Sequence, residues 1–131
     1  MWNTGCAIVH NRTSAIINIT DAEDPWRKLA LAGGQSRSFS GTIFPWCSNA
    51  DEVRNKAFLF RSGNASTGLG LFYMFQDYAN NPVSWTPYDG GHPSWDARTA
   101  AGAPPSSYVD VVVDGDAGSP NSITPSTIGL W

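Results

Sequence analysis

Short runs of alternating apolar and polar residues dominate this chain, and this pattern predicts strands rather than helices. The most regular run covers residues 108–114. The valines at positions 109, 111 and 113 are predicted to face inward, and Val112 falls among the residues predicted to face outward. A second run, 68–76, is apolar at both odd and even positions, with Leu69, Leu71, Tyr73 and Phe75 on one side. Because both faces of this strand are apolar, we expect both to be covered.

The rest of the chain divides into further short strands separated by Gly- and Pro-containing turns. After the apolar run, residues 77–82 form a turn and residues 83–88 return beside the strand. The other predicted strands are 6–10, 15–20, 26–31, 35–44, 56–61 and an edge strand at 126–131, with Trp131 packing back. Asn49 followed by Glu52 fits a helix N-terminus, so either one helical turn or a loop is expected there. Residues 90–107 are predicted to be irregular.

These elements amount to about eight or nine strands at spacings of about 8–12 residues, without an internal repeat or a linker. They predict one all-β domain over residues 1–131, an antiparallel β-sandwich, with a closed β-barrel as the alternative. The length of 131 residues is enough for one such core. The two cysteines, Cys6 and Cys47, are interpreted either as a disulfide or as two separate buried thiols.

Charge and hydropathy argue against several classes of protein. The formal net charge is −3 with only eight Lys and Arg residues, so a nucleic-acid partner is not expected. No apolar stretch approaches the ~18 residues of a membrane-spanning helix. The first residues do not resemble a signal peptide. The expected location is therefore either the cytoplasm with non-classical release or, for a mature chain, the outside of the cell.

Catalysis is not expected, because the sequence contains none of the familiar catalytic motifs. His10 lies in an early predicted strand and is interpreted as structural. Asp89 and Asp96 could supply the two carboxylates of a glycosidase, but any two loop aspartates would satisfy so loose a requirement.

The most informative stretch is residues 85–98, which combines aromatic and short polar side chains around two glycines. Sugars present a flat C–H face and a rim of hydroxyls, so their sites need an aromatic ring beside hydrogen-bonding groups. The sequence therefore predicts a lectin-like protein that binds glycans or glycoconjugates. The candidate ligand-binding residues are Trp85, Tyr88, Asp89, Gly91, His92, Trp95, Asp96 and Arg98. The competing interpretation is that the tryptophans close one end of the sandwich while Asp89 and His92 shape turns.

Two weaker patterns complete the set of candidate sites. Trp46 with Asn49 and Asp51 repeats the aromatic-and-polar pattern as a secondary ligand-binding candidate. Asp114, Asp116 and Asn121 resemble half of a calcium loop, although Asp-Gly is also an ordinary hairpin turn. No cofactor or metal is expected, and calcium is kept as an alternative.

Two other functions fit the same features. Trp and Tyr also favour bilayer interfaces, so the alternative is a protein that binds membrane lipid, or a pore-forming, cytolysin-type β-sandwich. A third interpretation is a structural domain whose aromatic residues are buried against another subunit, and a homo-oligomer is compatible with each of these functions.

Overall fold

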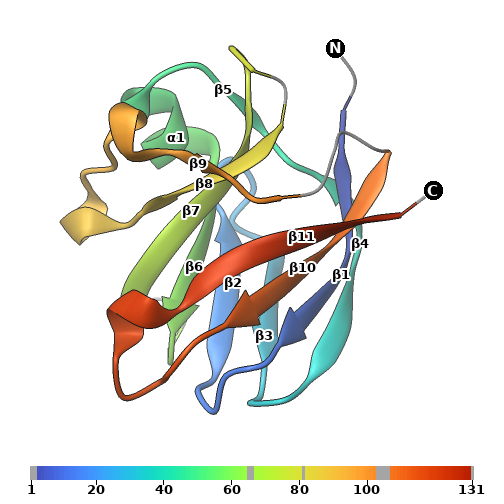
Figure 1. Cartoon of the computed structure of the whole chain (residues 1–131), viewed down its shortest axis with the longest axis vertical. Coiled ribbons are helices and arrows are strands. Elements are labelled where there is room, and N and C mark those ends of the chain that lie inside the picture. The colour runs from blue at the N-terminus through green and yellow to red at the C-terminus, as the bar shows by residue number, and fades with distance from the viewer. Residues whose placement is uncertain (1–2, 65–66, 81, 103–106, 131) are drawn as a thin grey trace.

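The computed structural model of the chain describes residues 3–64, 67–80, 82–102 and 107–130. Two β-sheets pack face to face in it, as predicted (Figure 1). The four-stranded sheet runs in the order β11 (Thr124–Leu130), β10 (Tyr108–Asp114), β1 (Gly5–Asn11), β4 (Ser36–Ile43). The other sheet runs in the order β3 (Lys28–Leu31), β2 (Ile17–Asp21), β6 (Phe58–Ser62), β7 (Leu69–Asp77), β8 (Val83–Pro87), β9 (Thr99–Ala100), with β5 (Trp46–Cys47) also paired to β7.

The arrangement is a sandwich and not the closed barrel, because each sheet ends in two separate edge strands. In the described residues every pairing is antiparallel except β1 with β10 and β5 with β7. The described part of the chain forms eleven strands, more than predicted. The two additional ones, β5 and β9, have two residues each, which is too short for any alternation to reveal them.

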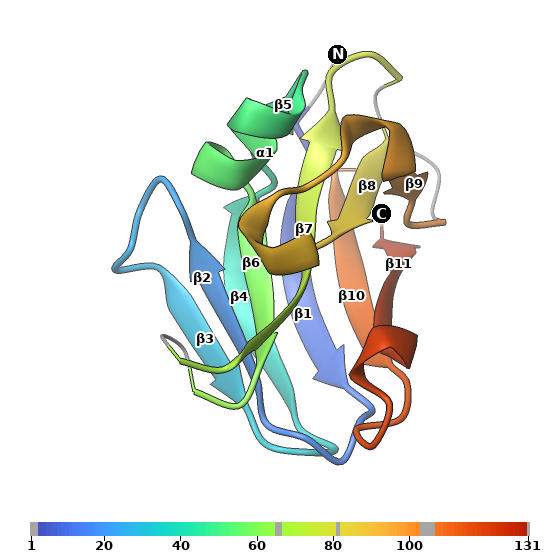
Figure 2. The ribbon, with the colours of Figure 1, turned by 90° about the vertical axis from the view of Figure 1, so that its left-hand side faces the viewer.

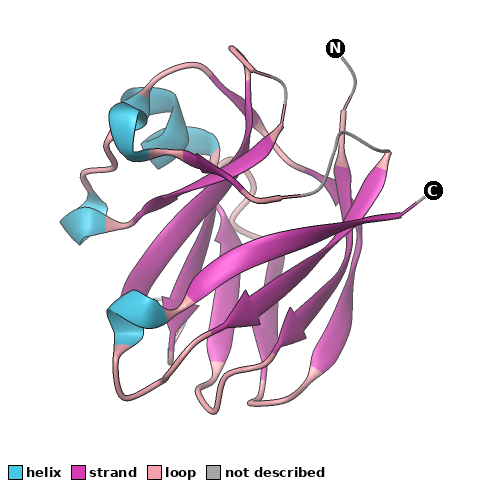
Figure 3. Ribbon diagram, in the orientation of Figure 1, coloured by secondary structure: helices cyan, strands magenta, loops and turns pink. Residues whose placement is uncertain are grey.

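Helices are few and lie on one side of the sandwich (Figure 3). The helix α1 covers Ala50–Lys56, and three 3₁₀ turns are η1 (Asp89–Gly91), η2 (Trp95–Ala97) and η3 (Pro120–Ser122). Among the described residues, no helix has the length and apolar character needed to cross a membrane.

The predicted cap of α1 is present. The Asn49 side chain accepts a hydrogen bond from the Glu52 N–H at 2.9 Å. In a standard capping box the glutamate side chain accepts the N–H of the cap residue itself. Here Glu52 reaches one residue further back, and its Oε1 accepts a hydrogen bond from the Ser48 N–H at 2.8 Å. The Ser48 hydroxyl, the Lys56 ammonium group and the Ser48 N–H all donate to the Glu52 carboxylate, and they hold its pKa well below its ordinary 4.5, at about 2. The helix has seven residues and ends at Lys56. The next strand therefore begins at Phe58, and not at residue 56 as predicted.

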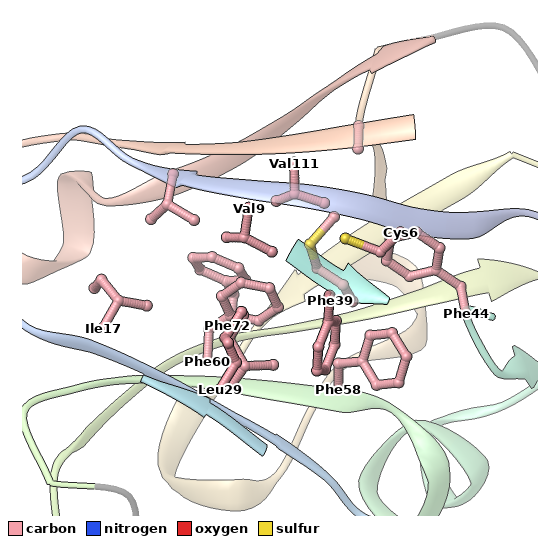
Figure 4. Close-up of a cluster of buried hydrophobic side chains, with 14 of the residues drawn as sticks. Cys6, Val9, Ile17, Leu29, Phe39, Phe44, Phe58, Phe60, Phe72 and Val111 are labelled. Atoms are coloured by element: carbon pink, nitrogen blue, oxygen red, sulfur yellow. The ribbon is translucent and has the colours of Figure 1, made fainter. Parts of the chain in front are cut away.

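The strongest sequence patterns are confirmed. The strand β10 has the predicted bounds, and its three inward valines are buried. They meet residues of the opposite sheet in the main core, where Figure 4 shows Val9 and Val111 facing Ile17, Phe60 and Phe72. From Phe72 to Phe75 the strand β7 is covered on both faces, as its sequence predicted, but Leu69 is 56% exposed and Leu71 packs against the main core instead of the outer face. Phe72 and Met74 lie in the main core, while Tyr73 and Phe75 lie in a second cluster on the outer face, against α1.

The structure adds to or corrects the strand predictions in three places. The strand predicted at 26–31 begins only at Lys28, because Asp24 forms a turn in which its side chain and its carbonyl accept the N–H groups of Trp26 and Arg27. Val112 lies outside the main core, in keeping with its predicted outward direction, but it is buried nonetheless. In β4, Phe39 and Thr42 are both buried although they are three positions apart, because the pairing with β1 is irregular between them. The predicted position of Trp131 lies outside the described residues.

The cysteines follow the second of the two interpretations. Both are free, and burial raises the pKa of each thiol to about 12. Cys6 lies in the main core and Cys47 in the second cluster, so β7 and its neighbours separate them.

The two open sides of the sandwich differ. On one side Ala101 links the sheets, because its N–H donates to Val83 O at 2.9 Å and its carbonyl accepts the Thr127 N–H at 2.8 Å. On the other side the edge strands β3 and β4 are bridged by the Arg37 side chain, whose Nη1 donates to Ala30 O at 2.9 Å. The first side is thus bridged by backbone hydrogen bonds and the second by a side chain.

Candidate functional site

The candidate segment begins where β8 ends. The strand β8 pairs with β7 up to Pro87, opposite Phe72. The chain then crosses the outer face of β7 through η1 and η2 before it returns as β9. Figure 2 shows this segment lying beside α1, in front of β6 and β7. Residues 88–98 and α1 thus share one surface of the molecule.

The backbone at the start of this segment is strained. Asp89, Gly90 and Gly91 have successive φ angles of 46°, 64° and 87°. Glycine adopts this left-handed region freely, but an aspartate there costs about 1–3 kcal/mol. Asp89 is the one non-glycine residue with positive φ among the described residues. Strain of this kind gathers at binding sites, so the position of the Asp89 side chain is of interest.

The Tyr88 ring is held against the sheet by two contacts. It stacks on Tyr73 with the ring centroids 5.7 Å apart. It also lies directly over Gly70, where a Cβ atom would come within 2.4 Å of the ring. Tyr88 is half-buried. A glycine in the interior of a strand often marks such a close approach.

Two adjoining cavities open beside this ring, and together we call them the Tyr88 cleft. Their volumes are about 250 Å³ and about 200 Å³. Both are lined by Gly70, Leu71, Pro87 and Asn121. The larger cavity adds Thr86, Tyr88, Asp89, Ser94 and Ala97, and the smaller one adds Trp85, Pro120 and Ile123. The cleft therefore lies between the open end of the β7–β8 hairpin, where β8 ends, and η3, which comes much later in the sequence.

Most polar side chains of the cleft have no hydrogen-bond partner among the described residues. Thr86 donates its hydroxyl to Ser94 O at 3.1 Å. Within the described part of the chain, the side chains of Asp89, Ser94 and Asn121 have no hydrogen-bond partner, and all three are exposed. A carboxylate, a hydroxyl and an amide are thus free to bind a ligand beside one aromatic ring.

The second half of the segment is built differently. Trp95 stacks on Phe75 with the ring centroids 5.7 Å apart, and the Arg98 guanidinium lies 4.1 Å from the centroid of the indole. Arg98 Nε donates to Asp77 Oδ2 at 2.6 Å, and its Nη1 donates to Trp95 O at 2.8 Å. The Asp77 side chain is only 3% exposed. Trp95 and Arg98 are therefore engaged in packing and do not line the cleft.

The remaining candidates are dispersed. Trp85 packs against the main core, edge-on to Phe72 at 6.0 Å, and reaches only the smaller cavity. Gly91 helps to form the turn. His92 and Asp96 are exposed and do not line the cleft. The structure brings Tyr88, Asp89 and Trp85 together, and not the whole set of eight.

The secondary candidates have partners of their own. Trp46 Nε1 donates to Asn3 Oδ1 at 2.8 Å, Asn49 caps α1, and Asp51 pairs with Arg54 at 3.2 Å. These contacts support the loop and the helix.

In the calcium candidate, Asp114 and Asp116 each accept a backbone N–H of their own turn at 2.8 Å. The third residue, Asn121, lines the Tyr88 cleft instead. The described residues contain no group of three or more His, Cys, Asp or Glu side chains placed to hold a metal ion. The calcium alternative stays a prediction.

The sequence analysis missed one conspicuous side chain. Trp26 is 90% exposed, although it was placed in a strand. It lines a cavity of about 380 Å³ on the side of the sandwich between β3 and β4. The lining contains two cations, Arg27 and Lys28, and no carboxylate. The floor is formed by Leu29 and Phe39. In the sequence, the only indication of this exposed position was the proline directly before Trp26, at the end of an acidic loop.

Comparisons with protein-family models, with curated proteins and with solved structures found no match for this chain. Any function must therefore be argued from the chemistry of these sites.

Proposed function

We propose that the chain is a carbohydrate-binding, lectin-like protein and that the Tyr88 cleft is its site. The observation that carries this proposal is the combination of a strained Asp89 with no hydrogen-bond partner among the described residues and the Tyr88 ring beside it. Backbone strain is retained where the position of a side chain matters. An exposed carboxylate without a partner is a ready acceptor for the hydroxyls of a sugar.

The other groups of the cleft suit the same ligand. The apolar face of a pyranose can lie on the Tyr88 ring, which packing on Tyr73 and Gly70 already holds in place. Ser94 can donate or accept, and Asn121 can do both at once. A fixed ring loses little conformational entropy when a ligand binds.

The affinity of one site should be low. Each hydrogen bond contributes about 1 kcal/mol net, and somewhat more when a charge is involved. Three such bonds with one stacking contact correspond to a Kd of about 0.1–10 mM. Strong binding to a cell surface would then need several sites on one particle, which is the effect of multivalency. The homo-oligomer that would supply them stays a prediction.

A glycan array followed by calorimetric titration of the best sugar tests this proposal. Asp89→Asn should weaken binding about tenfold, because it removes a charged acceptor. Asn121→Ala should weaken binding to a similar degree. Asp96→Asn is the matched control, since it removes the same charge from the same segment outside the cleft. Equal effects of Asp89→Asn and Asp96→Asn would contradict the site, and an array without any bound sugar would contradict the function.

The second candidate function, binding to membrane lipid, is favoured by a separate observation. An indole that is 90% exposed stands beside Arg27 and Lys28 at the largest of the cavities described above. Tryptophan and cationic side chains together suit the interface of a bilayer, where the ring enters the headgroup region and the cations meet phosphates.

Sedimentation with phosphatidylcholine vesicles, with and without phosphatidylserine, distinguishes the two candidates. Trp26→Ala should abolish vesicle binding if lipid is the ligand, and it should leave sugar binding unchanged. Asp89→Asn should have the opposite pattern. Vesicle binding that survives Trp26→Ala would contradict the lipid site.

A further inference from the structure

A chain of three hydrogen-bonded side chains crosses the outer face of the four-stranded sheet. The His10 ring lies between Ser36 and Asp110, with Nδ1 2.7 Å from Ser36 Oγ and Nε2 2.9 Å from Asp110 Oδ2. The three residues come from the adjacent strands β4, β1 and β10. The side chains of His10 and Asp110 are 27% and 15% exposed, and Ser36 is exposed. None of these residues takes part in the Tyr88 cleft.

The carboxylate of Asp110 sets the tautomer of the ring. A carboxylate accepts only, so His10 Nε2 carries the proton of that hydrogen bond. In the neutral ring, Nδ1 then has a free lone pair and accepts the Ser36 hydroxyl. This is the relationship of a serine nucleophile, its general base and an orienting acid, with the two ring nitrogens exchanged relative to the usual order.

The backbone holds Asp110 in place. The pairing of β1 with β10 is irregular between Cys6 and Val9, and there the Ile8 N–H donates to Asp110 Oδ1 at 3.2 Å. A β-bulge that redirects a side chain is common beside active sites. The carboxylate is thus bound at both of its oxygens and has little freedom to leave the imidazole.

The edge of the sheet leaves room for a substrate at Ser36. His10 and Ser36 are cross-strand partners, next to the pair in which the Asn11 N–H donates to Gln35 O at 2.9 Å. Antiparallel pairs alternate, so the backbone groups of Ser36 point away from β1. The strand β4 is an edge strand, and the Ser36 N–H therefore points to its open side. A backbone N–H of the nucleophile itself is one of the donors that stabilise an oxyanion in acyl transfer.

We propose that Ser36, His10 and Asp110 form a nucleophilic site that transfers the acyl group of small esters to water. Ser36 Oγ bonds to the acyl carbon while its proton passes to His10 Nδ1. The C–O bond of the ester then breaks, and the leaving oxygen takes that proton and departs as an alcohol. Water repeats the exchange at the acylated serine, which releases the carboxylic acid and restores Ser36. Asp110 acts as a positioning residue.

The surroundings indicate the class of substrate. Ile8 and Ile128 are 37% and 50% exposed on the same face of the sheet, and Ile128 is the cross-strand partner of Asp110. A short aliphatic acyl chain could cover these side chains and bury apolar surface. The favoured substrates are therefore esters of short aliphatic acids.

Labelling with an alkyl fluorophosphonate tests the proposal, because this reagent forms a stable bond with an activated serine. The wild-type protein should gain one adduct, and peptide mapping should place it at Ser36. Ser36→Ala should abolish the adduct. Ser38→Ala is the matched control, two residues further along the same strand, and should keep it. His10→Gln should slow labelling by about 100-fold or more, which is the usual contribution of a general base.

Asp110→Asn separates positioning from a structural role. It should slow labelling and shift the ¹⁵N signals of the His10 ring away from the Nε2–H tautomer, while the melting temperature of the folded protein changes little. Wild-type protein that gains no adduct at Ser36 would overturn the proposal without any variant. Labelling that is equally fast in His10→Gln would also overturn it.

Discussion

The two halves of residues 88–98 contain the same kinds of side chain and serve different purposes. In the second half, Trp95 and Arg98 are stacked on each other and tied to Phe75 and Asp77. In the first half, the ring of Tyr88 is fixed, but Asp89 has no partner among the described residues and its backbone is strained. Packing engages the charged group beside the ring in one half, Arg98, and leaves the one beside the ring in the other half, Asp89, available.

This difference shows that aromatic density does not identify a binding site. An aromatic ring beside a charged group describes both halves equally well. What separates them is whether the charged group already has a partner in the folded chain. A charge that is paired with a buried group supports the fold, whereas an exposed charge without a partner can bind a ligand at little cost in stability.

The largest effect is expected at Arg98. Arg98→Ala leaves the buried Asp77 carboxylate without its cation, which typically costs about 3–5 kcal/mol. Trp95→Ala removes the neighbouring stacked ring and should cost about 3 kcal/mol. Chemical denaturation measures both losses. Well below the lowered melting temperature, both variants should bind sugar as the wild type does. If Arg98→Ala or Trp95→Ala is fully stable but no longer binds sugar, the second half would be the binding site, which contradicts the proposed roles of the two halves.

A smaller effect is expected at Gly70, beneath Tyr88. In Gly70→Ala the new methyl group would overlap the ring, so the ring must move, at a cost of about 1–3 kcal/mol. Sugar affinity should fall because the stacking surface is displaced. Gly118→Ala is a control outside the cleft, where the new Cβ would meet only the end of the Asp116 side chain. Unchanged affinity in Gly70→Ala would show that the ring does not contact the sugar.

Asp89→Gly should separate stability from binding. Glycine adopts a φ of 46° without strain, but it also loses more freedom on folding. The free energy of unfolding should therefore stay the same or rise by up to about 1 kcal/mol. Sugar binding should be lost with the carboxylate. Thermal melting and calorimetry measure the two properties, and a clear loss of stability would contradict the assignment of strain.

The smallest effect is expected at the cap of α1, which lies outside both halves. Hydrogen bonds from Ser48 hold the pKa of Glu52 at about 2, below its ordinary 4.5. A lowered pKa stabilises the fold above pH 4.5, and this contribution is lost as the pH falls toward 2. Glu52→Gln should cost about 0.5–1 kcal/mol at pH 7. The stability curves of variant and wild type should converge near pH 2, and a constant difference down to that pH would contradict the cap.

The sequence alone determined the features that depend on neighbouring positions. The alternating valines of β10, the apolar residues on both faces of β7 and the Asn49 cap all extend over a few residues, so their patterns predict them. These patterns were sufficient for an all-β domain and favoured the sandwich, and the strand pairing then excluded the closed barrel. They also placed Tyr88 and Asp89 in the candidate segment, because the turn at Gly90 follows directly from local composition.

The tertiary structure decided which side chains became partners. Arg98 meets Asp77 at a separation of 21 residues, and His10 meets Asp110 at a separation of 100. Asn121 reaches the Tyr88 cleft from η3, and Trp26 is left in solvent by a turn at Asp24. Such residues meet because of the order and the register of the strands. Neither the order nor the register can be predicted from a local sequence pattern. Whether a polar residue is bound or free is therefore settled only when the sheets are assembled.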